Sequence, residues 1–301
     1  MKKTVAVLLA LTFVLLAFAA CGTTEKPTTT AATEAGSVVP ANEPEVTTEA
    51  ATEAATEAET ATEAESTTEA NKKPETAAEI LAAYAAVMNQ AKKDGPAFNK
   101  VEYQELPDDP QSRQINDGKA LVGAALKVAA NFMVTEDKAK SDPQYFEKGN
   151  DMAWWPIYNC EKGCMLEDAS FVKSAKCEEL SNGNYKITLV LKNEVNPEPA
   201  PEGASSAPSK HGGIFGAVSL KEIDDTLKGG IVSAVFKDVT YKLVYHDCTA
   251  TLIYNPENNQ VESLTQVLHV SISGYAKALG AGLDIANQEL INHVEFYNVK
   301  Y

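Results

Sequence analysis

The sequence predicts an α+β fold, in which an antiparallel β meander curls over one or more helices after a signal peptide and a disordered linker. Apolar residues recur at helical spacing between residues 74 and 134, and the period changes toward two after Asp142 and Pro143. Short connections separate the strand candidates in the last third of the chain. We expect a leader at residues 1–20, a linker at 21–72 and a single α+β domain at 73–301.

The first residues have the features of an export signal. Lys2 and Lys3 precede an apolar run at residues 5–18, which has the length of a secretory signal and is short for a relaxed membrane span. The following Phe18-Ala19-Ala20-Cys21 resembles the lipobox of bacterial lipoproteins, with Phe18 where leucine is usual. The alternative is an ordinary signal peptide with an Ala-x-Ala cleavage site and an incidental cysteine.

The resemblance to bacterial lipoproteins implies that Cys21 is lipidated on its sulfur and becomes the first residue of the mature protein. Two acyl chains give stable attachment without a spanning helix, because each buried methylene contributes about 0.8 kcal/mol. The resemblance therefore implies a lipid-anchored protein at the cell membrane that faces the extracellular side. On this interpretation the protein associates with the membrane through its lipid anchor.

Residues 22–70 consist mostly of Thr, Ala and Glu and contain no aromatic residue. The tripeptide Thr-Glu-Ala recurs there, beginning at Thr48, Thr52, Thr56, Thr62 and Thr68. Such a segment has too little apolar surface to offset the entropy of ordering, which predicts disorder. A helix is the alternative, and threonine together with like-charged glutamates four residues apart opposes it. Tethers of this kind resemble those of Gram-positive surface lipoproteins, and threonine-rich stretches are also substrates for O-glycosylation.

The chain is acidic throughout, apart from its leader. The leader carries +2 and residues 22–70 carry −10 of the overall −16, which leaves −8 for residues 71–301. Binding to nucleic acid or to anionic lipid headgroups needs basic patches. The charge therefore argues against a nucleic-acid partner and against electrostatic membrane binding by the folded part.

Three helices are predicted in the folded part. The first follows Pro74 and ends before Gly95 and Pro96, with a buried stripe at Ile80, Tyr84, Val87, Met88 and Ala91. The second is expected from residue 117 or 118 to residue 134. The third covers residues 219–228, with Ser219 and Glu222 as a capping box and glycines at its end.

Strands are predicted from residue 143 onward. The segment 154–158 is β-prone, residues 170–177 form a strand, residues 181–184 form a turn, and residues 185–191 alternate between apolar and polar. A loop rich in Pro, Gly and Ser follows at residues 196–213. Further strands are expected at residues 231–246, 249–254, 261–273 and 290–299, with a glycine-rich connection at residues 274–288.

The order and length of these elements over roughly residues 160–301 resemble the lipid-carrier lipoproteins of the LolA type and the tubular lipid-binding proteins. In both groups, long antiparallel strands wrap a helix and enclose an apolar cavity. The resemblance rests on no residue motif, so it implies an apolar ligand without assigning any binding residue.

Four cysteines remain besides Cys21: Cys160, Cys164, Cys177 and Cys248. An even count outside the cytoplasm suggests disulfides, with Cys160 paired to Cys164 across a short glycine-containing loop and Cys177 paired to Cys248 between strands. Free buried thiols are the alternative. A metal site is disfavoured, since the C-x3-C spacing is not that of a zinc knuckle and no histidine follows at ligand spacing. We expect neither a metal nor a cofactor.

The histidines His211, His246, His269 and His293 are scattered along the sequence. His246 and His269 lie on strands predicted to be neighbours, so a shared site is one interpretation. Half-buried strand histidines with polar tips are the other. The acidic pairs Asp108-Asp109 and Asp224-Asp225 have adjacent side chains that point in different directions, which fits solvation better than acid/base catalysis.

No nucleophile elbow, zinc-protease motif or phosphate loop occurs in the sequence, and Gly280-Ala281-Gly282 lacks the third glycine of a nucleotide cradle. Trp154, Trp155 and Tyr158 suggest a platform for a sugar or a partner. Because adjacent strand residues face opposite sides, one tryptophan is expected in the core and only the other is available.

The sequence thus favours a lipid-anchored extracellular module that binds an apolar or small ligand or a surface protein. Two alternatives remain open. The first is a structural component of the cell envelope, and the second is a surface hydrolase whose catalytic residues leave no local motif.

Overall fold

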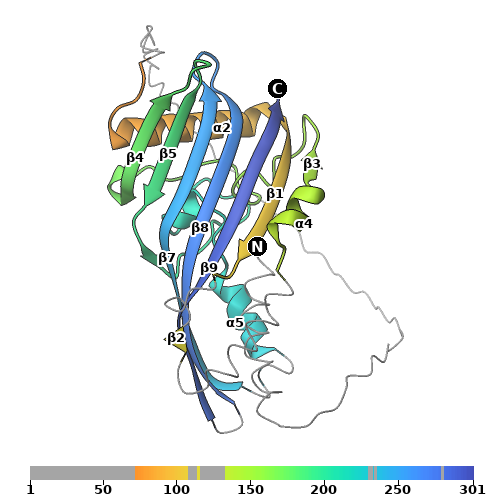
Figure 1. Cartoon of the computed structure of the whole chain (residues 1–301), viewed down its shortest axis with the longest axis vertical. Helices are drawn as coiled ribbons and strands as arrows, with labels where there is room; N and C mark the ends of the chain where they lie inside the picture. The colour runs from red at the N-terminus through yellow and green to blue at the C-terminus, as the bar shows by residue number, and fades with distance from the viewer. Residues whose placement is uncertain (1–71, 108–113, 116–132, 230–232, 234–235, 279–280) are drawn as a thin grey trace, which may run out of the picture. The chain divides into compact units, whose positions relative to one another are not determined.

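A nine-stranded antiparallel sheet, with β3-β1-β9-β8-β7-β5-β4 as its main path, forms the centre of the described chain (Figure 1). The computed structural model describes residues 72–107, 114–115, 133–229, 233, 236–278 and 281–301, which all belong to one unit. The sheet and its few helices confirm the α+β class and the mostly antiparallel sheet. The leader, the linker up to residue 71 and nearly all of the second predicted helix lie outside the described residues.

The first predicted helix is confirmed as α2 (Ala77–Asp94). The Thr76 side chain accepts a hydrogen bond from the amide of Glu79 at 3.2 Å, and the Glu79 carboxylate accepts one from the amide of Thr76 at 2.9 Å. These two bonds form a capping box at the first turn of the helix. Gly95 ends the helix in the left-handed conformation with φ of 57°. The buried stripe contains Leu81 in addition to the five residues that the sequence predicted.

Three long strands, β7 (Phe236–Asn255), β8 (Gln260–Ala278) and β9 (Ala281–Lys300), form the predicted meander. The expected break before Thr249 is a β-bulge within β7, where Asp247 has a φ of 49°. The expected glycine-rich connection at residues 274–288 is wrong, because β8 extends to Ala278 and β9 begins at Ala281. A Cβ on Gly282 would lie 3.2 Å from the ring of Tyr275, so this glycine admits a neighbouring aromatic ring instead of forming a loop.

β4 (Val172–Glu179) and β5 (Tyr185–Leu191) form the predicted hairpin and extend the sheet beyond β7. On the other side, β1 (Ala97–Glu105) pairs with β9, and β3 (Gln144–Phe146) pairs with β1. The strand β1 was not predicted from the sequence. The short β2 (Gln114–Ile115) and β6 (Glu194–Val195) pair with β9 and β7.

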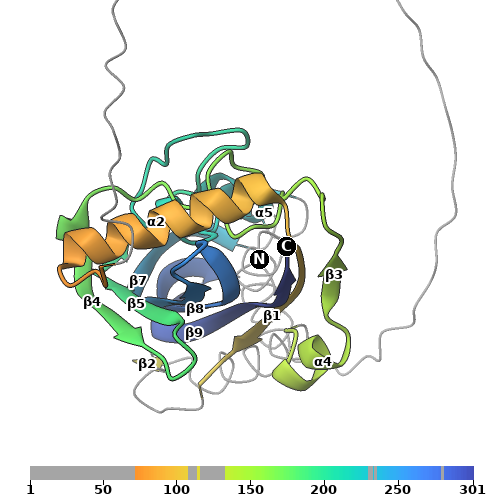
Figure 2. The same cartoon turned by 90° about the horizontal axis from the view of Figure 1, so that it is seen from above.

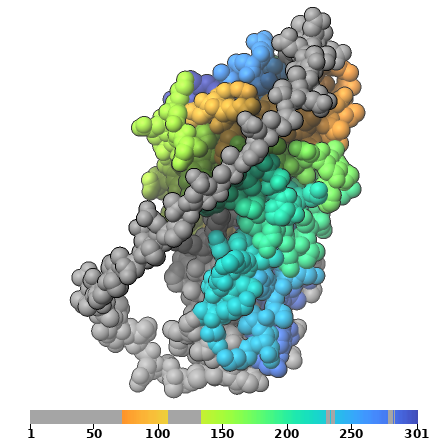
Figure 3. Space-filling model, turned by 180° about the vertical axis from the view of Figure 1, so that it is seen from behind, coloured from red at the N-terminus to blue at the C-terminus, as the bar shows by residue number. Residues whose placement is uncertain are grey.

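Two short helices complete the described fold. α4 (Glu136–Ser141) lies beside β1, and α5 (Leu220–Lys228) is the third predicted helix. Ser219 caps α5 by accepting from the amide of Glu222 at 3.3 Å. Seen from the helix side, the segment after β6 and α5 continue along the same side of the sheet as α2 (Figure 3).

The sheet has two different faces, and Figure 2 shows α2 lying across one of them. We call this the inner face, and the opposite one the outer face. On β8 the inner face carries a buried series: Leu264, Gln266, Leu268, Val270 and Ile272. Its apolar members belong to the same core as the buried stripe of α2. The intervening outer-face residues of β8 are partly exposed. The predicted alternation of β5 is also confirmed.

Candidate functional sites

Trp154 and Trp155 lie in a segment of turns at residues 151–159, not in the predicted strand. Trp155 is fully buried and contacts Phe98 and Phe296 at centroid distances of 5.1 and 5.0 Å. Trp154 is 41% exposed. One tryptophan in the core and one available at the surface is the arrangement that the sequence predicted, although turns and not a strand produce it.

A cation and a second aromatic ring contact Trp154. The Lys100 ammonium lies 5.0 Å from the centroid of the Trp154 ring, and the Tyr158 ring lies 4.5 Å from it at 57°. Lys100 comes from the inner face of β1, is 6% exposed, and pairs with Glu102 at 2.7 Å. Burial alone would raise the pKa of Glu102, but the charge of Lys100 acts in the opposite direction and the pKa lies below its ordinary value.

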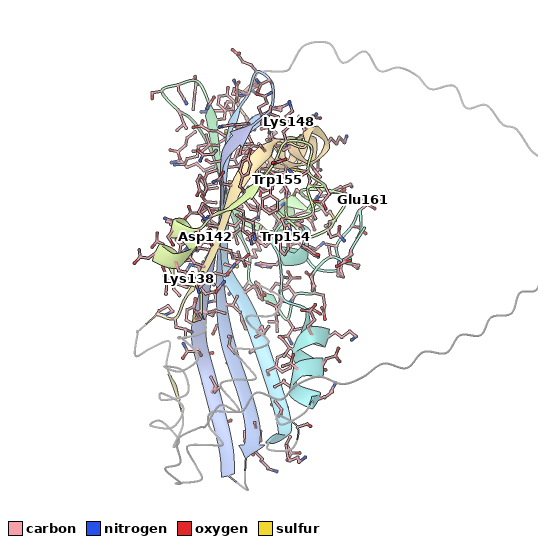
Figure 4. The ribbon with its side chains drawn as sticks, turned by 90° about the vertical axis from the view of Figure 1, so that its right-hand side faces the viewer. Lys138, Asp142, Lys148, Trp154, Trp155 and Glu161 are labelled. Atoms are coloured by element: carbon pink, nitrogen blue, oxygen red, sulfur yellow. The ribbon has the colours of Figure 1, made fainter. Side chains whose placement is uncertain are left out.

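Hydrogen bonds hold the backbone of this tryptophan segment in place. The Lys92 ammonium of α2 donates to the carbonyls of Met152 at 2.6 Å and Trp155 at 3.1 Å. Asn150 accepts from the amide of Met152 at 2.8 Å and donates to the carbonyl of Pro96 at 3.1 Å. Figure 4 shows the two tryptophans between α4, which carries Lys138, and the loop that carries Glu161. Trp154 therefore projects from a fixed loop.

On the outer face, the structure brings together two histidines that the sequence placed on neighbouring strands. His246 and His269 are direct cross-strand partners on β7 and β8, and their ring centroids are 5.7 Å apart. Glu289 of β9 joins them, with its Oε2 at 3.0 Å from Nε2 of His246 and its Oε1 at 3.0 Å from Nδ1 of His269. Asp247 lies 3.2 Å from Nδ1 of His246, and Lys173 of β4 pairs with Asp247 at 2.7 Å.

The charges in this outer-face histidine cluster support one another. The bond to Glu289 raises the pKa of His269 above its ordinary value of 6.5, against the opposing effect of partial burial. Burial would raise the pKa of Glu289, but the bonds from His269 and His246 lower it below its ordinary value of 4.5. Both shifts favour the ion-paired form.

The two imidazoles approach opposite oxygens of the Glu289 carboxylate, so their nitrogens do not converge on one point. In the described part of the chain, no group of three or more His, Cys, Asp or Glu side chains is arranged to hold a metal ion. The cluster is thus suited to holding protons and charge.

The other two histidines lie elsewhere. His293 stacks on Tyr103 at a centroid distance of 4.5 Å and lies 3.6 Å from Glu105 on the outer face. His211 is 1% exposed, and both its backbone amide and its Nδ1 lie 2.8 Å from Glu194. Burial lowers the pKa of His211, while Glu194 acts in the opposite direction. The Glu194–His211 pair fastens the long loop after β6 to the edge of the sheet.

All four domain cysteines are free thiols. Cys177 lies on β4 and Cys248 on β7, with β5 between them, so their sulfurs cannot bond across one strand spacing as the sequence suggested. Cys160 and Cys164 pack into different apolar clusters. Burial raises the pKa of Cys164 and of Cys248 to about 12, which keeps both thiols protonated. The free-thiol alternative describes this structure.

The acidic pair Asp224-Asp225 lies on a solvated face of α5, as predicted from the sequence. Asp224 pairs with Lys228 at 2.9 Å and accepts from the Tyr241 hydroxyl at 2.7 Å, while Asp225 pairs with Lys221. Asp108 and Asp109 lie outside the described residues. Within the described ranges, no helix has the length and apolar content needed to cross a bilayer.

Comparison with known proteins gives no matching family model, no curated relative and no similar solved structure. The assignment of a function therefore depends on the sequence and on the geometry of these sites.

The two tryptophans and the histidine pair were predicted from the sequence as candidate site residues, but the partners Lys100 and Glu289 were not. Glu289 lies between the predicted connection at residues 274–288 and the predicted strand at residues 290–299, and Lys100 lies in the strand that was not predicted. A signal for β1 was present in the alternation of Lys100, Glu102 and Gln104 with Val101 and Tyr103. Because Lys100 and Glu102 are charged, their inward positions did not read as the buried face of a strand.

Proposed function

We propose that this protein is a lipid-anchored extracellular binding module. Cys21 carries the lipid, the rest of the 21–72 linker is the spacer, and the α+β domain at 73–301 presents a ligand site at the cell surface. The lipobox-like sequence that ends at Cys21 and the acidic, aromatic-free spacer support the anchor and the location.

One observation carries the binding role: Trp154 is 41% exposed on a loop whose neighbouring tryptophan is fully buried. An exposed indole lacks the apolar contacts that a buried indole makes with the protein core. On a loop that hydrogen bonds hold in place, it can instead bind a ligand at little cost in conformational entropy. The space between α2 and the sheet is filled by the main apolar core, so we place the ligand at the surface rather than inside the fold.

The anchor is tested by mass spectrometry of the mature amino terminus from cells that produce the full-length protein. We expect cleavage before Cys21 and a diacylglycerol adduct on it. The Cys21→Ser variant is the matched control, and we expect it in the medium rather than in the membrane fraction. An unmodified thiol at Cys21, or cleavage at another position, would contradict the proposed function.

The location is tested by treating intact cells with a protease that does not enter them. We expect loss of the folded domain from the wild-type cells without loss of cytoplasmic markers. A domain that is protected until the cells are lysed would contradict a site at the extracellular side.

A further inference from the structure

The size of the exposed apolar surface limits the kind of ligand that Trp154 can take. The exposed large apolar side chains in the described part are Tyr145, Trp154 and Val195. Polar, exposed residues flank Trp154 in its loop, including Asp151 and Asn159. A standard protein–protein interface buries about 1,600 Å² around an apolar core, and one indole with a polar surround does not supply such a core. The surface therefore fits a small ligand with one flat apolar side.

The charges around Trp154 disfavour an ionic ligand. The Lys100 ammonium lies 5.0 Å from the ring centroid, so the negative potential of the ring already faces one cation. Lys100 already lies over the ring and is neutralised by Glu102 at 2.7 Å, so a second cation would gain little there, and an anion would meet a domain that carries −8. The remaining class is a neutral ligand.

From these observations we propose that Trp154 and Tyr158 form a binding site for a neutral sugar ring. This inference rests on the proposed function and names its ligand class. A pyranose has a face of C–H groups, which pack on the negative face of an indole, and a rim of hydroxyl groups. Tyr158, at 4.5 Å and 57° from Trp154, forms a second wall. Asp151 and Asn159 are exposed polar residues of the same loop, so the loop contains polar groups that suit a hydroxyl rim.

The fixed backbone makes this site preorganised. Lys92 and Asn150 hold residues 150–155 through four hydrogen bonds of 2.6–3.1 Å. A sugar that stacks on Trp154 thus orders few additional groups on binding, which reduces the entropic cost. Repeated sugars in a polymer would raise the apparent affinity further through multivalency.

The test is isothermal titration calorimetry of the detergent-solubilised full-length protein with chitotriose, cellotriose and maltotriose. We expect a dissociation constant of about 0.1–1 mM for at least one of them, and about tenfold weaker binding by the Trp154→Ala variant. Tyr145→Ala is the matched control, because Tyr145 is an exposed aromatic residue on β3 outside this loop, and we expect unchanged binding. Choline chloride, a cationic probe for aromatic sites, should give no binding heat.

Sedimentation with insoluble peptidoglycan and with chitin extends the test to polymers. We expect the wild-type protein and Tyr145→Ala to sediment with at least one polymer, and Trp154→Ala to stay in solution. The inference is overturned if no probe binds, if Trp154→Ala binds as the wild type does, or if choline binds in place of the sugars. Absence of sugar binding with a lipidated Cys21 removes this inference alone, whereas an unmodified Cys21 removes the proposed function even if a sugar binds.

Discussion

The two faces of the β7-β8-β9 meander are built from the same three strands but are held together by different forces. On the inner face, apolar side chains such as Leu264 and Leu268 pack against α2 with no exposed surface. On the outer face at the same strands, His246, His269 and Glu289 form a partly exposed network of charges. The inner face stabilises the fold by removing apolar area from water. The outer face contains charges whose contribution to stability depends on pH.

This difference implies that the stability of the fold comes mainly from the inner face. Burial of a large side chain contributes about 1.5–3 kcal/mol, whereas a partly exposed ion pair contributes about 1 kcal/mol or less. The outer face therefore modulates stability over a range of pH without deciding whether the protein folds.

The largest effect is expected from Trp155→Ala on the inner side. Its removal leaves a cavity beside Phe98 and Phe296, and we expect a loss of about 3–5 kcal/mol in the free energy of unfolding. Trp154→Ala is the matched control one residue away, with an expected change within about 0.5 kcal/mol because that ring is exposed. Urea denaturation followed by circular dichroism measures both. Equal losses in the two variants would show that Trp154 belongs to the core.

A smaller loss is expected from Glu194→Ala, which releases the loop that covers part of the inner side. Glu194 accepts from the amide of Lys210 at 3.1 Å and from the amide and Nδ1 of His211, each at 2.8 Å. Removal leaves these partly buried donors without their acceptor, at a cost of about 2–3 kcal/mol. Limited proteolysis should show faster cleavage within residues 196–214.

Glu202→Ala is the control for the loop, since Glu202 makes one exposed contact with Asn159 at 3.2 Å. We expect its cleavage rate and its urea midpoint to match the wild type. If Glu194→Ala also matches the wild type, apolar packing of residues 214–218 alone fastens the loop, and the Glu194 carboxylate has no structural role.

The inner face was easier to predict from the sequence than the outer one. Ile80, Tyr84 and Val87 show helical spacing, and the alternation of residues 185–191 shows a strand with one buried face, because burial imposes a period on apolar residues. Charged groups that meet across strands leave no such period. Glu289 lies 43 residues from His246, and only the register of β8 and β9 brings them together.

The strand boundaries failed for a related reason. Gly274 and Gly282 suggested a loop, since glycine is common in turns, but they lie within paired strands. The close approach of the Tyr275 ring to Gly282 is a tertiary contact, and no local pattern in the sequence reports it. β1 was missed because its inner face carries Lys100, Glu102 and Gln104 in place of apolar residues.

The contribution of the outer face to the stability of the fold should depend on pH. The raised pKa of His269 gives stability that is present below 6.5 and is lost as the pH rises through the folded value. The lowered pKa of Glu289 gives stability that is present above 4.5 and is lost as the pH falls through the folded value. Both contributions are present together between these limits, where His246, Asp247 and Lys173 complete the network.

Glu289→Gln should therefore destabilise the protein more at pH 5.5 than at pH 8, by about 1 kcal/mol after allowance for solvent screening. Glu295→Gln is the matched control on the same face of β9, because its partner Lys140, at 3.6 Å, stays charged over this range. Urea midpoints at the two pH values measure the effect. A loss of equal size at both values would mean that Glu289 acts only as a hydrogen-bond acceptor and that the charge of His269 does not contribute to the network.

The smallest effect is expected from Lys173→Ala, at the exposed end of the same network. Lys173 reaches Asp247 at 2.7 Å, but the two side chains are 55% and 56% exposed, so water and salt screen the pair. We expect a loss of about 0.3 kcal/mol in dilute buffer that disappears in about 1 M salt, with no difference between pH 5.5 and pH 8. A loss above about 1 kcal/mol would show that the left-handed backbone of Asp247 depends on this contact. In that case the ion pair would fix the bulge that brings His246 beside His269, and the exposed end of the outer-face network would control its partly buried centre.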